Sequence, residues 1–249
     1  NRYHHSTINY FATVPNPAPP DGNNLLGTDD RGRDILARLI YGFRVSVVFA
    51  LLVAAICTVV GVIYGAIQGY FAGWTDIPME RVNEIWSAMP TLYMLIILSS
   101  LFAPSFWLLV MLLSLFGWLG IAAYVRAEFL KNRTLDYVRA ARALGQRNRT
   151  IMMRHILPNS LTPVVTLIPF ELAGAIGALT SLDFLGLGVP PDRPSLGELL
   201  SQGKNNLDSW WIALSTFGVL VIMLLLLVLI GDALRDALDP RKVLEGDAP

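Results

Sequence analysis

The sequence has few charged residues, one cysteine and little histidine. Charged residues make up 15% of its 249 residues, whereas a typical soluble domain carries about a quarter. One cysteine and three histidines exclude a disulfide framework and a cysteine-based metal site. The 19 basic and 19 acidic residues cancel, and this neutrality argues against nucleic acid as a partner.

Two motifs of other protein classes are also absent. The sequence has no Gly-x-x-x-x-Gly-Lys-Ser/Thr phosphate loop, so this chain does not hydrolyse ATP by that means. Nothing resembles a cleavable signal peptide. Because the chain starts at Asn1 without a methionine or an apolar segment, we expect an N-terminal piece to be missing.

Apolar sequence is abundant instead. Hydrophobic residues make up 54% and the mean hydropathy is +0.52, and the apolar residues gather in runs near the roughly 20 residues that cross a bilayer. We predict an all-α membrane protein with an outer-face loop and interfacial helix (1–44), a transmembrane domain (45–231) and a cytoplasmic tail (232–249). The expected spans cover residues 45–70, 85–103, 106–125, 161–182 and 212–230.

Several spans contain residues that shape or interrupt a helix. Gly61, Gly65 and Gly69 recur every four residues at the end of the first span, which permits close helix packing. The second span is expected to kink at Pro90. The fourth is interrupted by two prolines and carries Glu171, which we expect either to line a translocation path or to pair with a neighbouring helix.

Polar segments flank the first span. Thr28 or Asp29 is expected to cap the interfacial helix that precedes it. After the span, Asp76, Glu80 and Glu84 recur every four residues and would share one helical face. No histidine or nucleophile accompanies them, which favours an ion-pair network or a partner contact over catalysis.

The loop at 126–160 is the most basic part of the chain. Eight of the 19 lysines and arginines lie between Arg126 and Asn159, and basic residues between spans are typical of a cytoplasmic loop. Asp136 to Gly145 is predicted to form a short helix, which the glycine ends. A second helix is predicted to lead to Leu157-Pro158. The simpler alternative is a basic connector that anchors the helices to anionic lipid.

This loop resembles the EAA loop of ABC-importer permeases. The family pattern is Glu-Ala-Ala, three residues, Gly, nine residues, Ile, one residue and Leu-Pro. Here Arg139-Ala140-Ala141, Gly145 and Leu157-Pro158 keep the spacing, while Arg139 replaces the glutamate and His155 the isoleucine. The strings LGTDDRGRDILARLIYGFRVS, HILPN and SLDFLGLGVPP are similar to the peptide-transporting branch, closest to permeases that import oligopeptides and microcin C.

The resemblance implies a fold, a site and partners. The fold would be a type I ABC-importer permease bundle, with a sixth span missing upstream, a cytoplasmic coupling helix and an outer loop at 183–211. The C-terminus would lie in the cytoplasm, and the protein in the bacterial inner membrane. The residues implied to couple to the ATPase are Tyr137, Arg139, Ala140, Ala141, Arg142, Ala143, Leu144, Gly145, Leu157 and Pro158.

The implied function is ATP-driven peptide import. Partners would be a homologous permease, ABC ATPase subunits that bind ATP and magnesium, a periplasmic substrate-binding protein and the peptide. No cofactor is expected in this chain. The alternatives are an ion-driven secondary transporter or channel, which would require acidic relays within the spans, and a membrane scaffold, which would not depend on the small residues of the loop.

Overall fold

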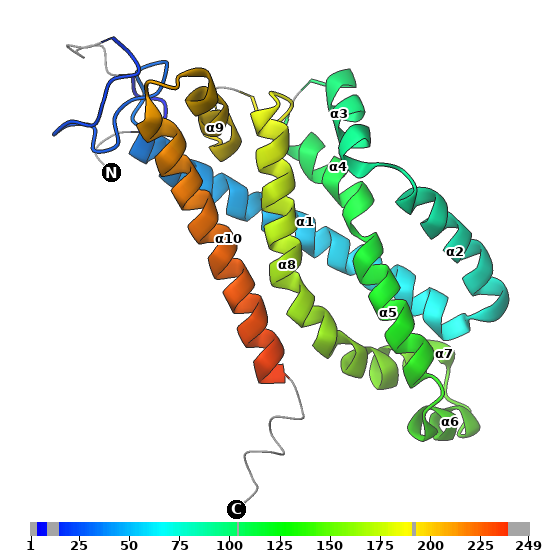
Figure 1. Cartoon of the computed structure of the whole chain (residues 1–249). Coiled ribbons are helices and arrows are strands. Elements are labelled where there is room, and N and C mark those ends of the chain that lie inside the picture. Colours follow the sequence, from blue (N-terminus) through cyan, green and yellow to red (C-terminus); the bar gives the residue numbers. More distant parts are fainter. Residues whose placement is uncertain (1–3, 9–14, 104, 191–192, 239–249) are drawn as a thin grey trace, which may run out of the picture. The chain divides into compact units, whose positions relative to one another are not determined.

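The computed structural model describes residues 4–8, 15–103, 105–190 and 193–238. Within these residues the regular structure is helical, apart from two isolated β-bridges. Figure 1 shows the helices in chain order. They are α1 (Ile35–Phe71), α2 (Gly73–Ser87), α3 (Thr91–Leu101), α4 (Phe106–Gly117), α5 (Leu119–Asn132), α6 (Asp136–Ala143), α7 (Asn148–Thr150), the π-helix η1 (Ile151–Ile156), α8 (Leu157–Phe184), α9 (Leu196–Asn205) and α10 (Trp210–Leu238).

The prediction of an all-α chain with several spans is confirmed. In the described residues, four helical segments are long and apolar enough to cross a membrane: Ile35–Phe71, Phe106–Asn132, Asn148–Phe184 and Trp210–Leu238. A fifth is added if α2 and α3, which are bent at the break between them, count as one broken span. The expected kink at Pro90 is therefore a break between two helices.

Several predicted boundaries differ from the structure. α1 is continuous through residue 45, so the residues expected to form an interfacial helix, from Ile35 onward, belong to the same helix as the first span. α5 continues beyond residue 125 to Asn132, and α10 continues to Leu238. The remainder of the predicted tail, 239–249, lies outside the described residues.

The chain divides into two compact units. The first consists of residues 1–52, 95–113 and 172–227, and the second of 53–94, 114–171 and 228–249. α1, α8 and α10 each contribute residues to both units.

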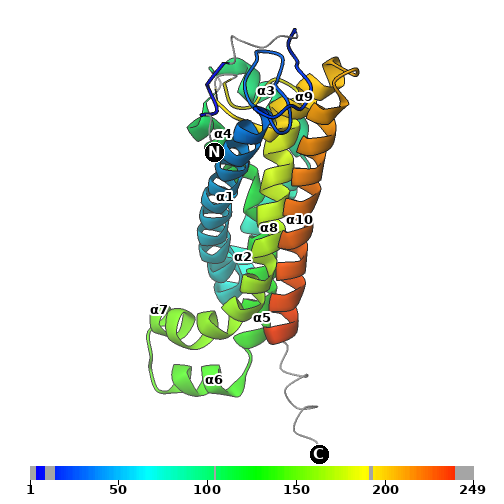
Figure 2. The ribbon, with the colours of Figure 1, turned by 90° about the vertical axis from the view of Figure 1, so that its left-hand side faces the viewer.

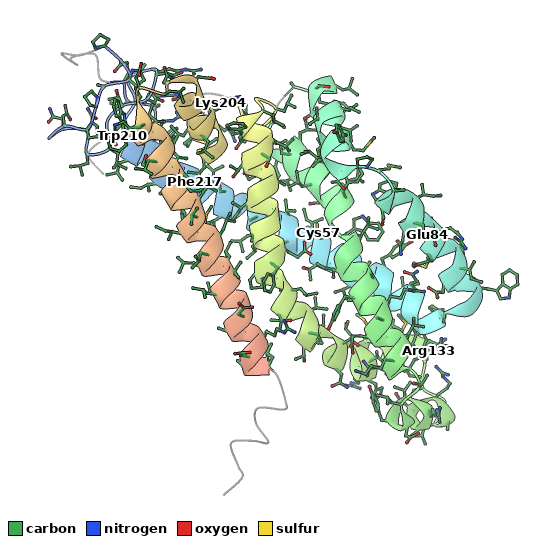
Figure 3. The ribbon with its side chains drawn as sticks, in the orientation of Figure 1. Cys57, Glu84, Arg133, Lys204, Trp210 and Phe217 are labelled. Carbon is green, nitrogen blue, oxygen red and sulfur yellow. The ribbon has the colours of Figure 1, made fainter. Side chains whose placement is uncertain are left out.

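In the first unit, α9 packs closely on the beginnings of α1 and α10. A Cβ added at Gly42 of α1 would lie 3.3 Å from Leu196 of α9, and one at Gly203 would lie 2.7 Å from Ala213 of α10. α9 and the start of α10 are seen together in Figure 1, and Figure 3 labels Lys204 and Trp210 on them. Ser195 caps α9, because its hydroxyl accepts a hydrogen bond from the Glu198 amide at 3.3 Å.

The segment before α1 is shaped by a buried carboxylate. Asp29 is fully buried and accepts hydrogen bonds from the amides of Arg31 (3.0 Å) and Arg33 (2.8 Å). Its side chain also pairs with the Arg33 guanidinium at 2.6 Å. The expected cap at Thr28 or Asp29 is therefore wrong: the Asp34 carboxylate caps α1 by accepting from the Ala37 amide at 2.8 Å.

A charged network connects this segment to α9. Arg38, on the first turn of α1, is fully buried, pairs with Glu198 of α9 and lies 3.5 Å from Asp29. Burial raises the pKa of the Glu198 carboxyl above its ordinary value, although Arg38 and Arg33 act in the opposite direction. The network holds the N-terminal loop and α9 together.

In the second unit, the glycines predicted to permit close packing bring α1 against α5. A Cβ added at Gly61 would lie 2.8 Å from Ile121, and one at Gly69 would lie 2.6 Å from the Arg126 carbonyl oxygen. A Cβ at Gly65 would overlap the Ala122 carbonyl oxygen. The obstacle is backbone, which has no rotamer to change, so only glycine allows this approach.

Replacing Gly65 with alanine should destabilise the protein. The added methyl group would force the two helices apart, at a cost of about 1–3 kcal/mol, which exceeds the gain of about 1 kcal/mol in helix propensity. A lower midpoint of thermal unfolding in detergent is expected. Gly218→Ala in α10 is the control, because a Cβ there meets nothing within 4 Å; equal midpoints for the two variants would contradict the packing argument.

Replacing Asp29 with asparagine should destabilise the first unit. The change leaves the buried guanidiniums of Arg33 and Arg38 without one of their two carboxylate partners, and loss of one member of a buried pair costs about 3–5 kcal/mol. Asp30→Asn is the matched control, because that neighbouring side chain is exposed. Thermal unfolding of the two variants checks this, and a loss of stability as large in Asp30→Asn as in Asp29→Asn would refute it.

Candidate functional site

The short helix predicted in the basic loop is α6, and it ends as expected. Gly145 follows it with a left-handed φ of 74°. The Gly145 amide donates to the Arg142 carbonyl (3.0 Å), and the Gln146 amide donates to the Ala141 carbonyl (3.2 Å). This pair of bonds is a Schellman motif, which satisfies carbonyls that a helix end leaves unpaired.

The two faces of α6 have different roles. Val138 and Ala141 are buried, and α6 packs on η1. Figure 2 shows α6 beside the helical segment that begins with α7. Tyr137 is 39% and Leu144 is 80% exposed. Leu144 is therefore a largely exposed apolar side chain beside the arginines of the loop.

The predicted coupling residues therefore do not form one surface. Ala141 belongs to the packing face, whereas Ala140, Ala143 and Leu144 are exposed. Leu157 and Pro158 lie at the start of α8, where Leu157 is half-buried and Pro158 exposed. The residues on the exposed side of the loop are Tyr137, Arg139, Ala140, Arg142, Ala143, Leu144 and Gly145.

The second predicted helix is also confirmed, and part of it is a π-helix. η1 covers Ile151–Ile156 and runs directly into α8. Pro158 has no amide hydrogen, and its ring would crowd the carbonyl four residues earlier in a regular α-helix. The wider turn of a π-helix avoids this conflict, which explains why the Leu157 amide donates to the Met152 carbonyl, five residues back.

Tyr70, at the end of α1, anchors the loop. Its hydroxyl donates to Asn148 Oδ1 at 2.8 Å, and its carbonyl accepts from Arg133 at 3.1 Å. The Arg142 guanidinium lies over its ring, 5.8 Å from the centroid. Figure 3 labels Arg133 at the end of α5, beside the loop. Sequence reasoning missed Tyr70 because only the folded chain brings the end of α1 to this loop.

Arg126, counted with the basic loop in the sequence, belongs to α5 and is paired. Its guanidinium binds Asp76 of α2 through two bonds of 2.6 and 2.8 Å, and lies 3.7 Å from Glu80. Glu80 also accepts from Gln68 at 2.8 Å. Glu84 pairs with Arg81 on the exposed side of α2. The acidic residues of α2 thus form the ion-pair network that their spacing predicts.

Glu171 lies on α8, half-buried, and faces α5. A Cβ added at Gly120 would lie 3.9 Å from Glu171 Oε1. In the described part of the chain, no hydrogen bond or ion pair holds this carboxylate. The alternative in which Glu171 pairs with a neighbouring helix therefore has no partner among these residues.

The sequence is similar to known proteins of one family. Residues 61–243 match the family model of binding-protein-dependent transport system inner membrane components. The chain is 49% identical to the peptidoglycan transport system permease protein YejE of Agrobacterium fabrum, covering 97% of this chain and 70% of that protein. It is also 49% identical to the inner membrane ABC transporter permease protein YejE of Escherichia coli, with 97% and 71% covered.

A further sequence relative and a solved structure extend the comparison. The oligopeptide permease OppC of Haemophilus influenzae is 38% identical, covering 89% of this chain and 71% of that protein. The inward-facing MetNI methionine ABC transporter has a similar fold, with a TM-score of 0.69 over 82% of this chain and 97% of that one, at 16% identity. The chain therefore belongs to the binding-protein-dependent transport system inner membrane components and is a permease component of an ABC importer.

Proposed function

We propose that this chain forms half of the pore of an ATP-driven peptide importer and is coupled to ATPase subunits through α6. The printed names of the relatives include peptidoglycan and oligopeptide permeases. These names support a peptide substrate, such as an oligopeptide or a peptide antibiotic of the microcin C type. The other half of the pore would be a homologous permease.

The observation that carries the coupling role is the construction of α6. One face is packed on η1 through Val138 and Ala141, while Leu144 at its tip is 80% exposed. Around it lie the arginines of the loop, with Arg139 only loosely paired to Asp136 at 3.8 Å. A partner surface with an apolar socket and an acidic rim would fit this helix.

The arginine at position 139 reverses the charge of the family pattern. Its side chain is 69% exposed, so it is available to a partner. A glutamate at this position would pair with a basic residue of the ATPase. With Arg139 in its place, the contact on the ATPase would be a carboxylate.

The packing of α6 on η1 provides a mechanical path. Closure of the ATPases around ATP would displace α6, and η1 would transmit the displacement directly into α8. A rigid movement of such helices would alternate the pore between inward-facing and outward-facing states. Magnesium and ATP would be bound by the ATPase subunits.

The proposed topology places α6 and the C-terminus in the cytoplasm and residues 183–211 on the outer face. Substrate would arrive from a periplasmic binding protein in a bacterial inner membrane. Glu171 remains our candidate for the translocation path, where its carboxylate would meet a peptide amine.

An ion-driven transporter is the second candidate function. It rests on Glu171, the half-buried acidic residue of α8. A relay requires a series of such groups, and the acidic residues of α2 are instead engaged in ion pairs. ATP-driven import is therefore the better account.

Replacing Leu144 with aspartate should abolish co-purification of the ATPase while leaving the chain folded. The side chain is exposed, so its loss removes little packing within the chain, but the charge would enter the apolar socket. Affinity purification from mild detergent, followed by mass spectrometry, measures the ATPase retained.

Leu207→Asp is the matched control, because Leu207 is 81% exposed in the connector between α9 and α10. Retention of the ATPase by Leu207→Asp and its loss in Leu144→Asp is the expected pattern. Full retention by Leu144→Asp would refute docking at the tip of α6.

Replacing Gly145 with alanine should reduce uptake per ATP hydrolysed. A Cβ there meets nothing within 4 Å, so the cost is backbone strain alone, about 1–2 kcal/mol. That strain would loosen the tip of α6. Gly145→Asn should retain more coupling, because asparagine tolerates the left-handed conformation. Reconstituted complexes measure both quantities, and wild-type coupling in Gly145→Ala would refute the role of the cap.

A further inference from the structure

An apolar cavity of about 530 Å³ runs along one side of α1 in the second unit. Its volume is that of a ligand site, for which about 300–1,000 Å³ is usual. The α1 residues that line it extend from Thr58 to Phe71, about 20 Å at 1.5 Å per residue. One leaflet of a bilayer has a hydrocarbon depth of about 15 Å, so an acyl chain fits the length of the cavity.

A basic cavity of about 390 Å³ lies at the end of α1. It is lined by three arginines, Arg133, Arg139 and Arg142, and by no carboxylate. Tyr70 orients two of them, because its carbonyl accepts from Arg133 and its ring supports Arg142. Guanidinium groups arranged in this way bind phosphate oxygens through paired hydrogen bonds.

The two cavities are neighbours. Phe71 and Asn148 line both of them. Asn148 and Arg149 are polar residues that line the apolar cavity. Of the two, Asn148 also lines the basic cavity. A ligand that occupied both would need an anionic head and an apolar tail.

We propose that this pair of cavities is a binding site for an anionic phospholipid. Its phosphate would bind Arg133 and Arg142, and one acyl chain would lie along α1 between Phe71 and Thr58. A soluble phosphate would leave the apolar cavity unused, and an apolar helix from another subunit would leave Arg133 and Arg142 without an anion. The inference goes beyond the coupling role, although a lipid bound here would link α1 to α6.

The test is lipid binding by the full chain purified in detergent. Native mass spectrometry would compare phosphatidylglycerol with phosphatidylcholine of the same acyl chains, and glycerol phosphate would be added as a soluble competitor. We expect phosphatidylglycerol to bind about tenfold more tightly than phosphatidylcholine, because its anionic head is unshielded and can accept paired hydrogen bonds from the guanidinium groups. Glycerol phosphate should not displace it.

Two sets of variants separate binding of the lipid head from binding of its tail. Arg142→Gln should reduce the preference for phosphatidylglycerol, and Arg133→Gln/Arg142→Gln should remove it, whereas Arg154→Gln, an exposed arginine that lines neither cavity, should not change it. Ile63→Trp should fill the apolar cavity and weaken the binding of both lipids. Val60→Trp, on the same helix but outside the cavity, should leave the binding of both unchanged. Thermal unfolding confirms that each variant is folded.

A photoreactive residue at Val59, which lines the groove and is 58% exposed, identifies the occupant in the assembled transporter. Crosslinking to lipid is the expected result. Equal affinity for the two lipids, unchanged binding in Ile63→Trp, or crosslinking to a second permease would overturn the proposal. Because no ATPase takes part in the lipid measurements, their failure is distinct from failure of the coupling model.

Discussion

The contact between α1 and α5 is the constraint on which the second unit depends. Three glycines let the two backbones meet, and no larger residue would fit at Gly65. The same close approach brings the Tyr70 carbonyl within reach of Arg133. Moving the helices further apart by the width of a methyl group would strain that bond, which is one of the contacts through which Tyr70 anchors the basic loop.

Both units use paired charges inside apolar packing. In the first, Asp29, Arg33, Arg38 and Glu198 hold the N-terminal loop to α9. In the second, Asp76 and Arg126 join α2 to α5. Burial of an unpaired charge is costly, so each pair restricts the arrangements in which its helices can pack. The few charges of this chain thus specify helix positions that its many apolar residues would leave open.

The parts that could be predicted from the sequence have local causes. Apolar runs indicate the spans, and Gly145 indicates the end of α6 because a left-handed residue is needed there. The start of α1 was not predictable. Asp29 is a residue type that often caps helices, but here its carboxylate forms ion pairs with Arg33 and Arg38. The inward position of Ala141 depends on where η1 lies, and the basic cavity depends on Tyr70, which is distant in sequence.

The π-helix η1 has a consequence for how this loop can vary. A π-turn holds one residue more than the α-turn it replaces, so the helix carries a spare residue between Gly145 and Leu157. Removing it would take away the wider turn that accommodates Pro158 and would rotate everything before it by about 100° around the axis of α8, one residue's share of a turn. Leu144 would then point in another direction. The length of this stretch therefore determines the direction in which α6 points. An insertion that an ordinary loop would tolerate would change that direction here.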